Sequence, residues 1–438
     1  MKTFFTNNVQ DMPVGSEVRI LGWVGARRTH GNQVFIDIYD SRGKVQVVVN
    51  KDDSCFGNAI EVSPESSVEV IGQAQKSIGG RHKAMEIRAT QVTLINKATI
   101  ALEPKPRTIR NPFDERSTDH LLRNRHLYQR NSKMMAVTKF RAKLMRILHD
   151  WFFSQEFVEV HTPILTTVPL YDDCSVLSLN FGGGVAYLSQ CAGFYLECMV
   201  HGLERIYNIS PSFRGESSKS RRHLAEYWHV KAEMAWVTRE DLLEFVERTM
   251  YNIIQRCQID CIEELDILGA EIPLYAMQIP YPRITYRKAI QRLQEYSVDC
   301  EFGRSLGVEA EDRLAADFQR PFWITSIPRQ IEPFPYVIDR EDPECTMTAD
   351  LVVPYGYGEL LGVAEKIFDL RELDERMVEK GKTGDPRYNW VRQLREYGCV
   401  PHGGVGIGFE RLIRWLISLG HVREAIAFPR ALHRAIYP

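Results

Sequence analysis

The sequence lacks several features that mark secreted, membrane and zinc-ribbon proteins. It has 9 cysteines in 438 residues, and no two of them form a Cys-x-x-Cys pair. A dispersed, odd number of cysteines argues for reduced thiols and against both a disulfide framework and a zinc ribbon. The start, MKTFFTNNVQDMPVG, has neither the apolar core nor the cleavage site of a signal peptide. No apolar run is long enough to span a bilayer, so we expect a cytoplasmic protein.

An excess of charge of one sign is also missing. The chain has 55 Lys and Arg against 57 Asp and Glu, a net charge of -2 that does not mark a general nucleic-acid binder. Basic residues outnumber acidic ones in residues 1–135, however, and the reverse holds in the remainder. This favours an anionic partner for the N-terminal part, although solvated faces alone also produce such a split. A glycine-rich phosphate loop and βαβ regularity are absent, which argues against a doubly wound nucleotide-binding fold.

Short strands with alternating apolar and polar residues fill the first hundred residues. Three of them, separated by the turns HGN and SRG, read EVRILGWVGA, QVFIDIYD and KVQVVV, and two more read SSVEVIGQAQ and AMEIRATQVTLI. Five such strands suit a small closed barrel, for which the oligonucleotide-binding (OB) fold is the common solution. Phe35, Arg27 and Arg28 are the predicted nucleic-acid contacts, because an unstacked base needs an aromatic ring and cations. A barrel without a ligand is the alternative.

The rest of the chain divides into a linker and a larger domain. Residues 101–131 are polar, basic and interrupted by proline, which indicates a linker after a barrel domain at residues 1–100. Apolar residues then recur at helical spacing over residues 137–152, and FVEVHTP reads as a strand that ends at a proline. Residues 132–438 mix strands and helices. We therefore predict an α+β chain with a second domain over residues 132–438.

The segment 205–236 combines arginines and carboxylates in a pattern that suits a nucleotide. A strand runs into Phe213-Arg214-Gly215-Glu216, crosses a loop rich in Ser, Lys and Arg, and returns as a strand through Glu226 and Tyr227. An arginine at the end of a strand, beside a basic loop, can hold an α-phosphate while the loop gathers the other phosphates.

Two further segments lie nearer the C-terminus. Asp350 and Glu359 flank the turn PYGYG and could share a magnesium ion, and the strand GGVGIG leads into a helix that opens with Glu410 and Arg411. Each segment alone is a weak signal, because Arg–Glu pairs are usually surface salt bridges. Together, in this order, they resemble motifs 2 and 3 of a class II aminoacyl-tRNA synthetase, and the helix–strand–proline unit at 137–163 resembles motif 1.

The order of barrel, linker and catalytic domain resembles the aspartyl/asparaginyl subgroup over nearly the whole chain. RRHLAEYWHVKAE and VPHGGVGIGFERL are most similar to archaeal and eukaryotic asparaginyl-tRNA synthetases. Leu196 agrees, since aspartyl enzymes carry a lysine there. On the barrel, Phe35 sits where the family stacks an anticodon base, but Tyr39 stands where relatives have an arginine. The resemblance implies a class II catalytic domain, an antiparallel sheet flanked by helices, that forms a homodimer through residues 137–170. It also implies an ATP- and Mg²⁺-dependent ligase that adenylates a carboxylate and transfers the acyl group to an acceptor.

The resemblance also assigns roles in ATP binding, and every residue required for them is present. These residues are Arg214, Glu216, Arg222, His223, Tyr227, Glu359 and Arg411. Arg214 would hold the α-phosphate and Arg411 the γ-phosphate, so these two are the predicted catalytic residues. Glu216 and Tyr227 would contact adenine. The outer phosphates fall to Arg222 and His223, and the magnesium ion to Asp350 and Glu359.

The predicted substrate pocket departs from the family pattern. Its residues are Tyr171, Asp172, Gln190, Gly193, His229, Lys231 and Lys366. Tyr171 replaces a glutamate that binds the α-ammonium group, Lys231 a glutamate that accepts the asparagine amide, and Lys366 an arginine that grips the substrate side chain. Gly193 replaces a substrate-contacting glutamine. We therefore expect a paralogue with an altered carboxylate substrate.

Two alternatives remain open. The chain could be an orthodox asparaginyl-tRNA synthetase in which Lys231 pairs with Glu233, Asp172 or Asp173, so that asparagine binding is preserved. It could also be a non-catalytic RNA-binding or regulatory protein. The last alternative ranks third, because such a protein has no need to keep Arg214 and Arg411 together.

Overall fold

The chain forms two compact units, Met1–Pro112 and Phe113–Pro438. The structure is a computed structural model, which describes residues 1–77, 84–101, 103–114, 118–169, 175–216, 220–432 and 434–437. The interval 101–131, predicted as a linker, falls in both units, and its last part carries the short helices α2 (Thr118–Arg123) and α3 (Arg125–Tyr128). Among the described residues, no helix is long and apolar enough to cross a membrane.

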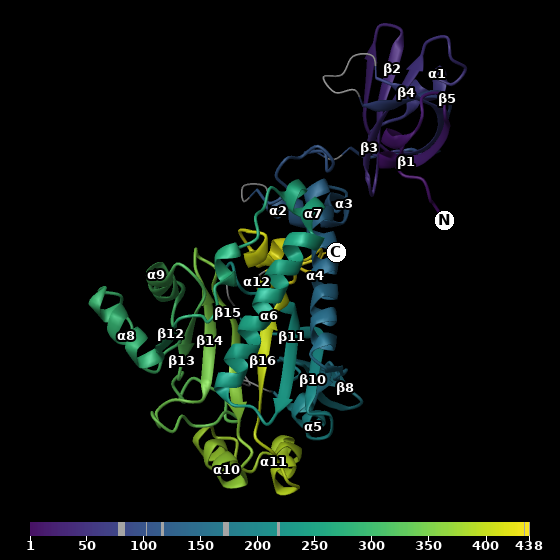
Figure 1. Cartoon of the computed structure of the whole chain (residues 1–438). Coiled ribbons are helices and arrows are strands. Elements are labelled where there is room, and N and C mark those ends of the chain that lie inside the picture. The colour runs from purple at the N-terminus through teal and green to yellow at the C-terminus, as the bar shows by residue number, and fades with distance from the viewer. Residues whose placement is uncertain are drawn as a thin grey trace. The chain divides into compact units, whose positions relative to one another are not determined.

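The first unit is a closed barrel of five strands, as the alternation of apolar and polar residues predicts (Figure 1). The barrel order is β1-β2-β3-β5-β4, and a short helix, α1 (Phe56–Glu61), lies between β3 and β4 along the chain. The strands are β1 (Glu17–His30), β2 (Gln33–Asp40), β3 (Gly43–Asn50), β4 (Ser67–Lys76) and β5 (Met85–Asn96). Inward-facing Val, Ile and Ala side chains fill the barrel, which confirms the predicted OB architecture.

An eight-stranded sheet organises the second unit, in the order β12-β13-β14-β15-β16-β11-β10-β6. Its strands are β6 (Val158–Glu159), β10 (Arg205–Phe213), β11 (Glu226–Ala235), β12 (Arg283–Thr285), β13 (Phe322–Thr325), β14 (Thr348–Val353), β15 (Gly358–Lys366) and β16 (His402–Gly408). The central strands pair antiparallel, as predicted, whereas the edge strands β6 and β12 pair parallel with their neighbours. The edges differ because long crossover segments connect β6 to β10 and β12 to β13.

Helices and a small second sheet complete this unit. The small sheet has the order β7-β9-β8, with β7 (Leu165–Thr166), β8 (Leu177–Phe181) and β9 (Gly184–Leu188). The remaining α-helices are α4 (Ser132–Ser154), α5 (Gly193–Leu203), α6 (Arg239–Asp260), α7 (Ile262–Leu268), α8 (Tyr286–Glu295), α9 (Val308–Phe318), α10 (Leu370–Glu379), α11 (Asn389–Glu396) and α12 (Phe409–Leu416). Short 3₁₀ helices are η1 (Thr6–Asp11), η3 (Leu274–Met277), η4 (Pro386–Tyr388) and η5 (Val422–Glu424).

The main core lies between the sheet and the helices α4, α6 and α12. Apolar side chains recur at helical spacing on α4, where Phe140 and Leu144 are fully buried. They belong to the same packed cluster as Val405 and Ile407 of β16. Figure 1 shows α4 and α6 running alongside the strands. This packing closes one face of the central strands, so alternate residues of those strands face the opposite side.

Candidate active site

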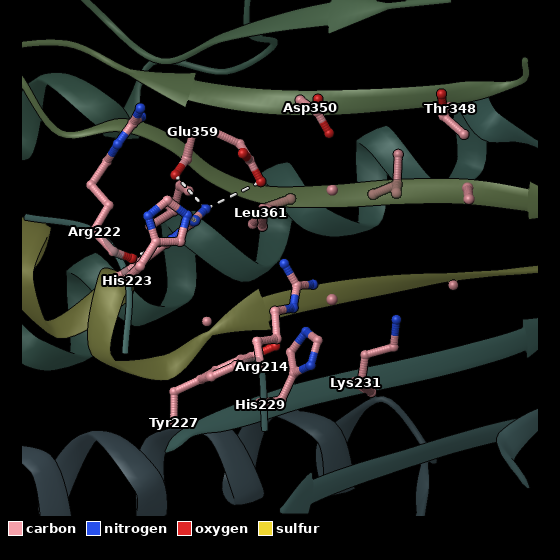
Figure 2. A pocket seen from close by; sticks show the side chains of 18 of the residues that line it. Arg214, Arg222, His223, Tyr227, His229, Lys231, Thr348, Asp350, Glu359 and Leu361 are labelled. Atoms are coloured by element: carbon pink, nitrogen blue, oxygen red, sulfur yellow. Dashed lines mark hydrogen bonds and ion pairs between the residues drawn. The ribbon is translucent and has the colours of Figure 1, made fainter. Parts of the chain in front are cut away.

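A pocket of about 280 Å³ opens over the central strands (Figure 2). On β11, Val230 and Ala232 belong to the main core, while the alternate residues His229 and Lys231 line the pocket. Figure 2 shows His229, Lys231 and Arg214 along one side of this pocket and the carboxylates of Asp350 and Glu359 on the other. The pocket therefore brings Arg214 and Lys231 into the same space as two carboxylates.

Glycines on β16 give the pocket its depth. Gly404, Gly406 and Gly408 occupy alternate positions of the strand and line the pocket. A Cβ at Gly406 would come within 2.9 Å of His229 Nε2 and 3.0 Å of Lys231 Nζ. The glycine-rich strand predicted from GGVGIG thus leaves room for a ligand above the backbone.

Arg214 enters the pocket directly after the last residue of β10, at the strand end where the sequence places it. Its backbone N–H donates to the carbonyl oxygen of Ala225 at 2.9 Å, which closes the β10–β11 hairpin at this point. The guanidinium carbon lies 5.9 Å from the centre of the Tyr227 ring, and Nη1 lies 3.8 Å from Glu216 Oε1. Burial raises the pKa of Tyr227, so this residue offers a neutral aromatic wall.

Arg222 and His223 reach the same end of the pocket from the β10–β11 connection. Arg222 forms an ion pair with Glu311 of α9, and Oε2 of Glu311 also accepts the backbone N–H of Glu359 at 2.9 Å. His223 Nε2 lies 3.3 Å from Arg411 Nη2. Burial and the neighbouring Arg411 lower the pKa of His223 to about 4, so its ring is neutral at pH 7.

Arg411, in the first turn of α12, contacts both His223 and the β14–β15 hairpin. Its Nη1 lies 3.2 Å from Oε1 of Glu359 and donates to the Glu359 carbonyl oxygen, also at 3.2 Å. Burial alone would raise the pKa of Glu359, but Arg411, Arg214 and Arg222 lower it. The Glu359 carboxylate is therefore ionised and surrounded by guanidinium groups.

Asp350 and Glu359 come from neighbouring strands of one hairpin. Asp350 pairs with Gly362 across β14 and β15, and its Oδ1 would lie 3.0 Å from a Cβ at Gly362. Burial, then Glu359 and Glu332, raise the pKa of Asp350 well above its ordinary value. A divalent cation would relieve this repulsion, and carboxylate oxygens are the protein ligands that Mg²⁺ prefers. The two residues therefore fit the predicted magnesium site.

Lys366 lies at the far end of the pocket, within a buried cluster of charges. Its Nζ lies 3.0 Å from Glu233 Oε2 and 3.1 Å from Glu197 Oε1. Burial would lower the pKa of Lys366, but Glu197 and Glu233 raise it, so the ammonium group stays charged. Arg395 also donates to Glu197, at 2.6 Å. Lys366 is thus held by two carboxylates of the protein, a role that the sequence did not suggest.

Lys231 is 8% exposed and lines the pocket beside His229. Glu233, one of its expected partners, pairs with Lys366 instead. The other expected partners, Asp172 and Asp173, lie outside the described residues, and within these residues Lys231 has no ion pair. Burial and the adjacent Lys231 lower the pKa of His229, which is therefore neutral.

The other predicted substrate-pocket residues do not line the pocket or lie outside the described residues. The latter are Tyr171 and Asp172, in the stretch 170–174. Gln190 is buried, donates to Ser175 Oγ at 2.9 Å, and accepts the hydroxyl of Tyr227 at its carbonyl oxygen at 3.5 Å. Gly193 is buried at the start of α5. Gln190 therefore contacts Tyr227 without lining the pocket itself.

The loop between β13 and β14 supplies pocket residues that the motifs did not indicate. Glu332 and Tyr336 line the pocket from this loop, and Thr348 does so from the start of β14. Burial, with Glu359 next, raises the pKa of Glu332 to about 7. No spacing or composition signal in IPRQIEPFPY relates this loop to the arginine-bearing strands, so sequence reasoning had no means of finding it.

The predicted nucleic-acid residues lie together on the β1–β2 hairpin of the barrel. Phe35 pairs directly with Arg28, so these two side chains share one face of the sheet. Arg27 pairs with Ile36 and lies on the other face, although it is exposed. Arg28 therefore shares the face of Phe35, where its Nη2 also donates to Asp37 Oδ1 at 2.9 Å, whereas Arg27 does not share that face.

Comparisons with known proteins agree with this arrangement. A family model described as tRNA synthetases class II (D, K and N) matches residues 117–432, and one described as OB-fold nucleic acid binding domain matches residues 18–95. The asparagine–tRNA ligase of Thermococcus kodakarensis is 35% identical, with 97% of this chain and 96% of that protein covered. The asparagine–tRNA ligase of Desulforamulus reducens is 34% identical, with 97% of both covered.

A solved structure extends the similarity to three dimensions. The asparaginyl-tRNA synthetase from Pyrococcus horikoshii complexed with asparaginyl-adenylate is 33% identical, covers 100% of both chains and superposes with a TM-score of 0.90. The asparaginyl-tRNA synthetase of Entamoeba histolytica, also in complex with asparaginyl-adenylate, is 26% identical with a TM-score of 0.85. The chain therefore belongs to the class II tRNA synthetases, a family of ATP-dependent, adenylate-forming ligases.

Proposed function

We propose that this chain activates asparagine with ATP and transfers the asparaginyl group to tRNA. The observation that carries the proposal is the convergence of Arg214, Tyr227, Glu359 and Arg411 in one pocket. This convergence occurs in a chain that is about a third identical, over nearly its whole length, to asparagine–tRNA ligases. An orthodox ligase, given above as an alternative to the altered paralogue, is thus the better supported candidate.

In this reaction the protein binds and positions the reactants and supplies no nucleophile. The substrate carboxylate attacks the α-phosphorus of ATP, and pyrophosphate leaves. Arg214 would stabilise the charge that develops on the α-phosphate, and Tyr227 would stack on adenine. Arg411 and His223 would contact the outer phosphates. A magnesium ion held by Asp350 and Glu359 would supply further positive charge to the phosphates.

Pyrophosphate exchange with a panel of amino acids tests this proposal. We expect asparagine to give the strongest exchange, and the same protein to charge tRNA with asparagine. Exchange that depends on a different carboxylate would overturn the choice of substrate and support the second candidate below. Absence of exchange with every carboxylate would support the non-catalytic alternative.

The second candidate is a ligase with a different carboxylate substrate, and Lys231 favours it. Its ammonium group is buried beside Gly406, and Lys366 is already held by Glu197 and Glu233. An asparagine NH₂ placed at Lys231 would face a donor, and leaving a buried polar group unpaired costs about 1–3 kcal/mol. A substrate with an additional carboxylate would meet Lys231 with opposite charge.

The variant Lys231→Glu separates the two candidates by the sign of its effect. If the native substrate is asparagine, Lys231 donates to the amide oxygen, and reversing the charge should lower asparagine-dependent exchange about 100-fold. If the substrate is an acidic relative, the same change should raise the use of asparagine instead. Arg304→Glu, at an exposed ion pair with Glu301, is the control and should leave exchange unchanged.

The proposal includes a second copy of the chain and a tRNA. Within the predicted dimer region, the exposed apolar side chains are Phe153, Val158, Ile164 and Leu165. Phe181 and Val185, in strands β8 and β9 of the small sheet, are exposed as well. Because β6 is also an edge strand of the large sheet, this region supports the predicted homodimer. Phe35 and Arg28 on the barrel support contact with an RNA base. The described cysteines are free thiols, in agreement with the cytoplasmic location that we propose.

A further inference from the structure

Three side chains with metal-ligating atoms meet beside the buried charge cluster. His201 lies in the last turn of α5. Cys399 lies in the segment before β16, and His402 is the first residue of that strand. One ligand atom of each residue lies within 4.8 Å of the others. We propose that His201, Cys399 and His402 form a binding site for Zn²⁺, with a water molecule completing the coordination.

The donor set is that of zinc. One thiolate and two imidazoles suit Zn²⁺, whereas Mg²⁺ and Ca²⁺ prefer oxygen ligands. With Zn–S bonds of about 2.3 Å and Zn–N bonds of about 2.0 Å, the ligand atoms of a tetrahedral site lie roughly 3.3–3.6 Å apart. Cys399 Sγ lies 2.9 Å from His201 Nε2 and 3.9 Å from His402 Nδ1. The two sulfur–nitrogen separations bracket the tetrahedral value, and the ring centres of His201 and His402 lie 5.5 Å apart.

The outward-facing nitrogen of each histidine faces an acceptor. Nδ1 of His201 lies 2.6 Å from the carbonyl oxygen of Glu197, and Nε2 of His402 lies 3.6 Å from the carboxylate Oε2 of Glu197. Zinc-bound histidines usually donate their second N–H to a carbonyl or carboxylate in this manner. Nε2 of His402 is buried and makes no closer hydrogen bond among the described residues. Nδ1 of His402 also lies 2.8 Å from the Val400 carbonyl oxygen, a contact that metal binding would replace.

A metal ion here would link α5 to the start of β16, two segments that are distant in sequence. Glu197 would connect this site to the substrate pocket. His201 belongs to the helix that also carries Glu197, and Glu197 contacts both His402 and Lys366. Lys366 in turn lines the pocket. We assign the ion a positioning role, because it would fix Glu197 and hence Lys366 without contacting a substrate.

Cobalt titration of the purified full-length chain tests the site. Co²⁺ bound to a thiolate gives a sulfur-to-cobalt charge-transfer band, which a carboxylate site such as Asp350 and Glu359 does not produce. We expect this band to saturate at one equivalent of Co²⁺, to disappear on addition of one equivalent of Zn²⁺, and to be lost in Cys399→Ser. The readout needs no enzymatic activity, so it is independent of the proposed function.

Matched variants keep the proposal testable if Cys399→Ser destabilises the chain. Cys198→Ser removes an exposed thiol on the same helix as His201 and should retain the band in full. His201→Gln should weaken Co²⁺ binding at least about tenfold. The proposal is overturned if the native chain gives no charge-transfer band, or if the band survives in Cys399→Ser.

Discussion

Replacing Arg214 by alanine is expected to lower ATP–pyrophosphate exchange by about 10²–10³-fold, the usual cost of removing one preorganised group that stabilises transition-state charge. Arg214 projects from the end of β10 into a pocket that already contains Arg222 and Arg411. Those two arginines are engaged with Glu311 and Glu359, however, so neither is placed to substitute for Arg214. The loss should appear mainly in kcat, because the charge on the α-phosphate grows in the transition state.

Two variants separate this role from a general loss of positive charge. Arg214→Lys keeps the charge but loses the planar fork, so we expect intermediate activity. Arg205→Ala removes the arginine that begins β10, which is more than half exposed and lies 3.6 Å from Glu156. Its exchange activity should match that of the native chain. Near-native activity of Arg214→Ala would show that the assignment of the α-phosphate position is wrong.

The local features of this site could be predicted because each depends on a short stretch of chain. Strand alternation places Arg214 at the end of β10, the turn PYGYG sets the β14–β15 hairpin, and the glycines of β16 precede Arg411. The five barrel strands were predictable for the same reason, since period-two alternation and turn residues are local signals. The parallel edges of the large sheet were not, because they depend on long crossover segments.

Partners that are distant in sequence were missed. Glu311 reaches Arg222 from α9, 89 residues away, and Glu332 enters the pocket from a loop that carries no motif. Lys366 lines the pocket, but its ion pairs with Glu197 and Glu233 were not expected. Such pairs arise from the packing of separate elements, and no spacing rule connects their members.

The barrel gives a further example of a missed distant partner. Tyr39 stands where the resemblance places an arginine in relatives, and this replacement removes a cation from that face of the barrel. The Arg107 guanidinium lies 5.6 Å from the centre of the Tyr39 ring and 5.5 Å from that of Trp23. Arg107 is also bonded to Glu65. A cation from a separate segment therefore adjoins the position where the replaced arginine would stand.

Replacing Lys366 by methionine is expected to destabilise the second unit by about 3–5 kcal/mol, because it leaves buried carboxylates without their cation. Glu197 and Glu233 are both fully buried, and each lies about 3 Å from Lys366 Nζ. Arg395 still pairs with Glu197, so Glu197 loses one of its two cations, whereas Glu233 loses the lysine to which it is paired. Urea unfolding followed by tryptophan fluorescence measures the effect, since every tryptophan except Trp23 lies in the second unit.

Lys366→Arg and Lys231→Met are the controls for this variant. Lys366→Arg keeps the charge between the two glutamates and should cost less than half as much. Lys231→Met also removes a buried lysine from the same pocket, but one with no ion pair among the described residues, so it should cost little or even stabilise the chain. Equal destabilisation by Lys366→Met and Lys231→Met would show that the ion pairs of Lys366 contribute nothing specific.

The pH dependence of the Lys366→Met effect follows from the carboxylate that Lys366 faces. Burial would raise the pKa of Glu197, but Lys366 and Arg395 hold it well below its ordinary value of 4.5. Such a group stabilises the fold above pH 4.5, and this contribution is lost as the pH falls through the folded-state pKa. The pKa of Lys366 is raised above 10.5, so its own contribution is complete below that pH. The difference in stability between the native chain and Lys366→Met should therefore be largest near neutral pH and shrink below pH 4.5. A difference that grows on acidification would contradict the ion-pair explanation.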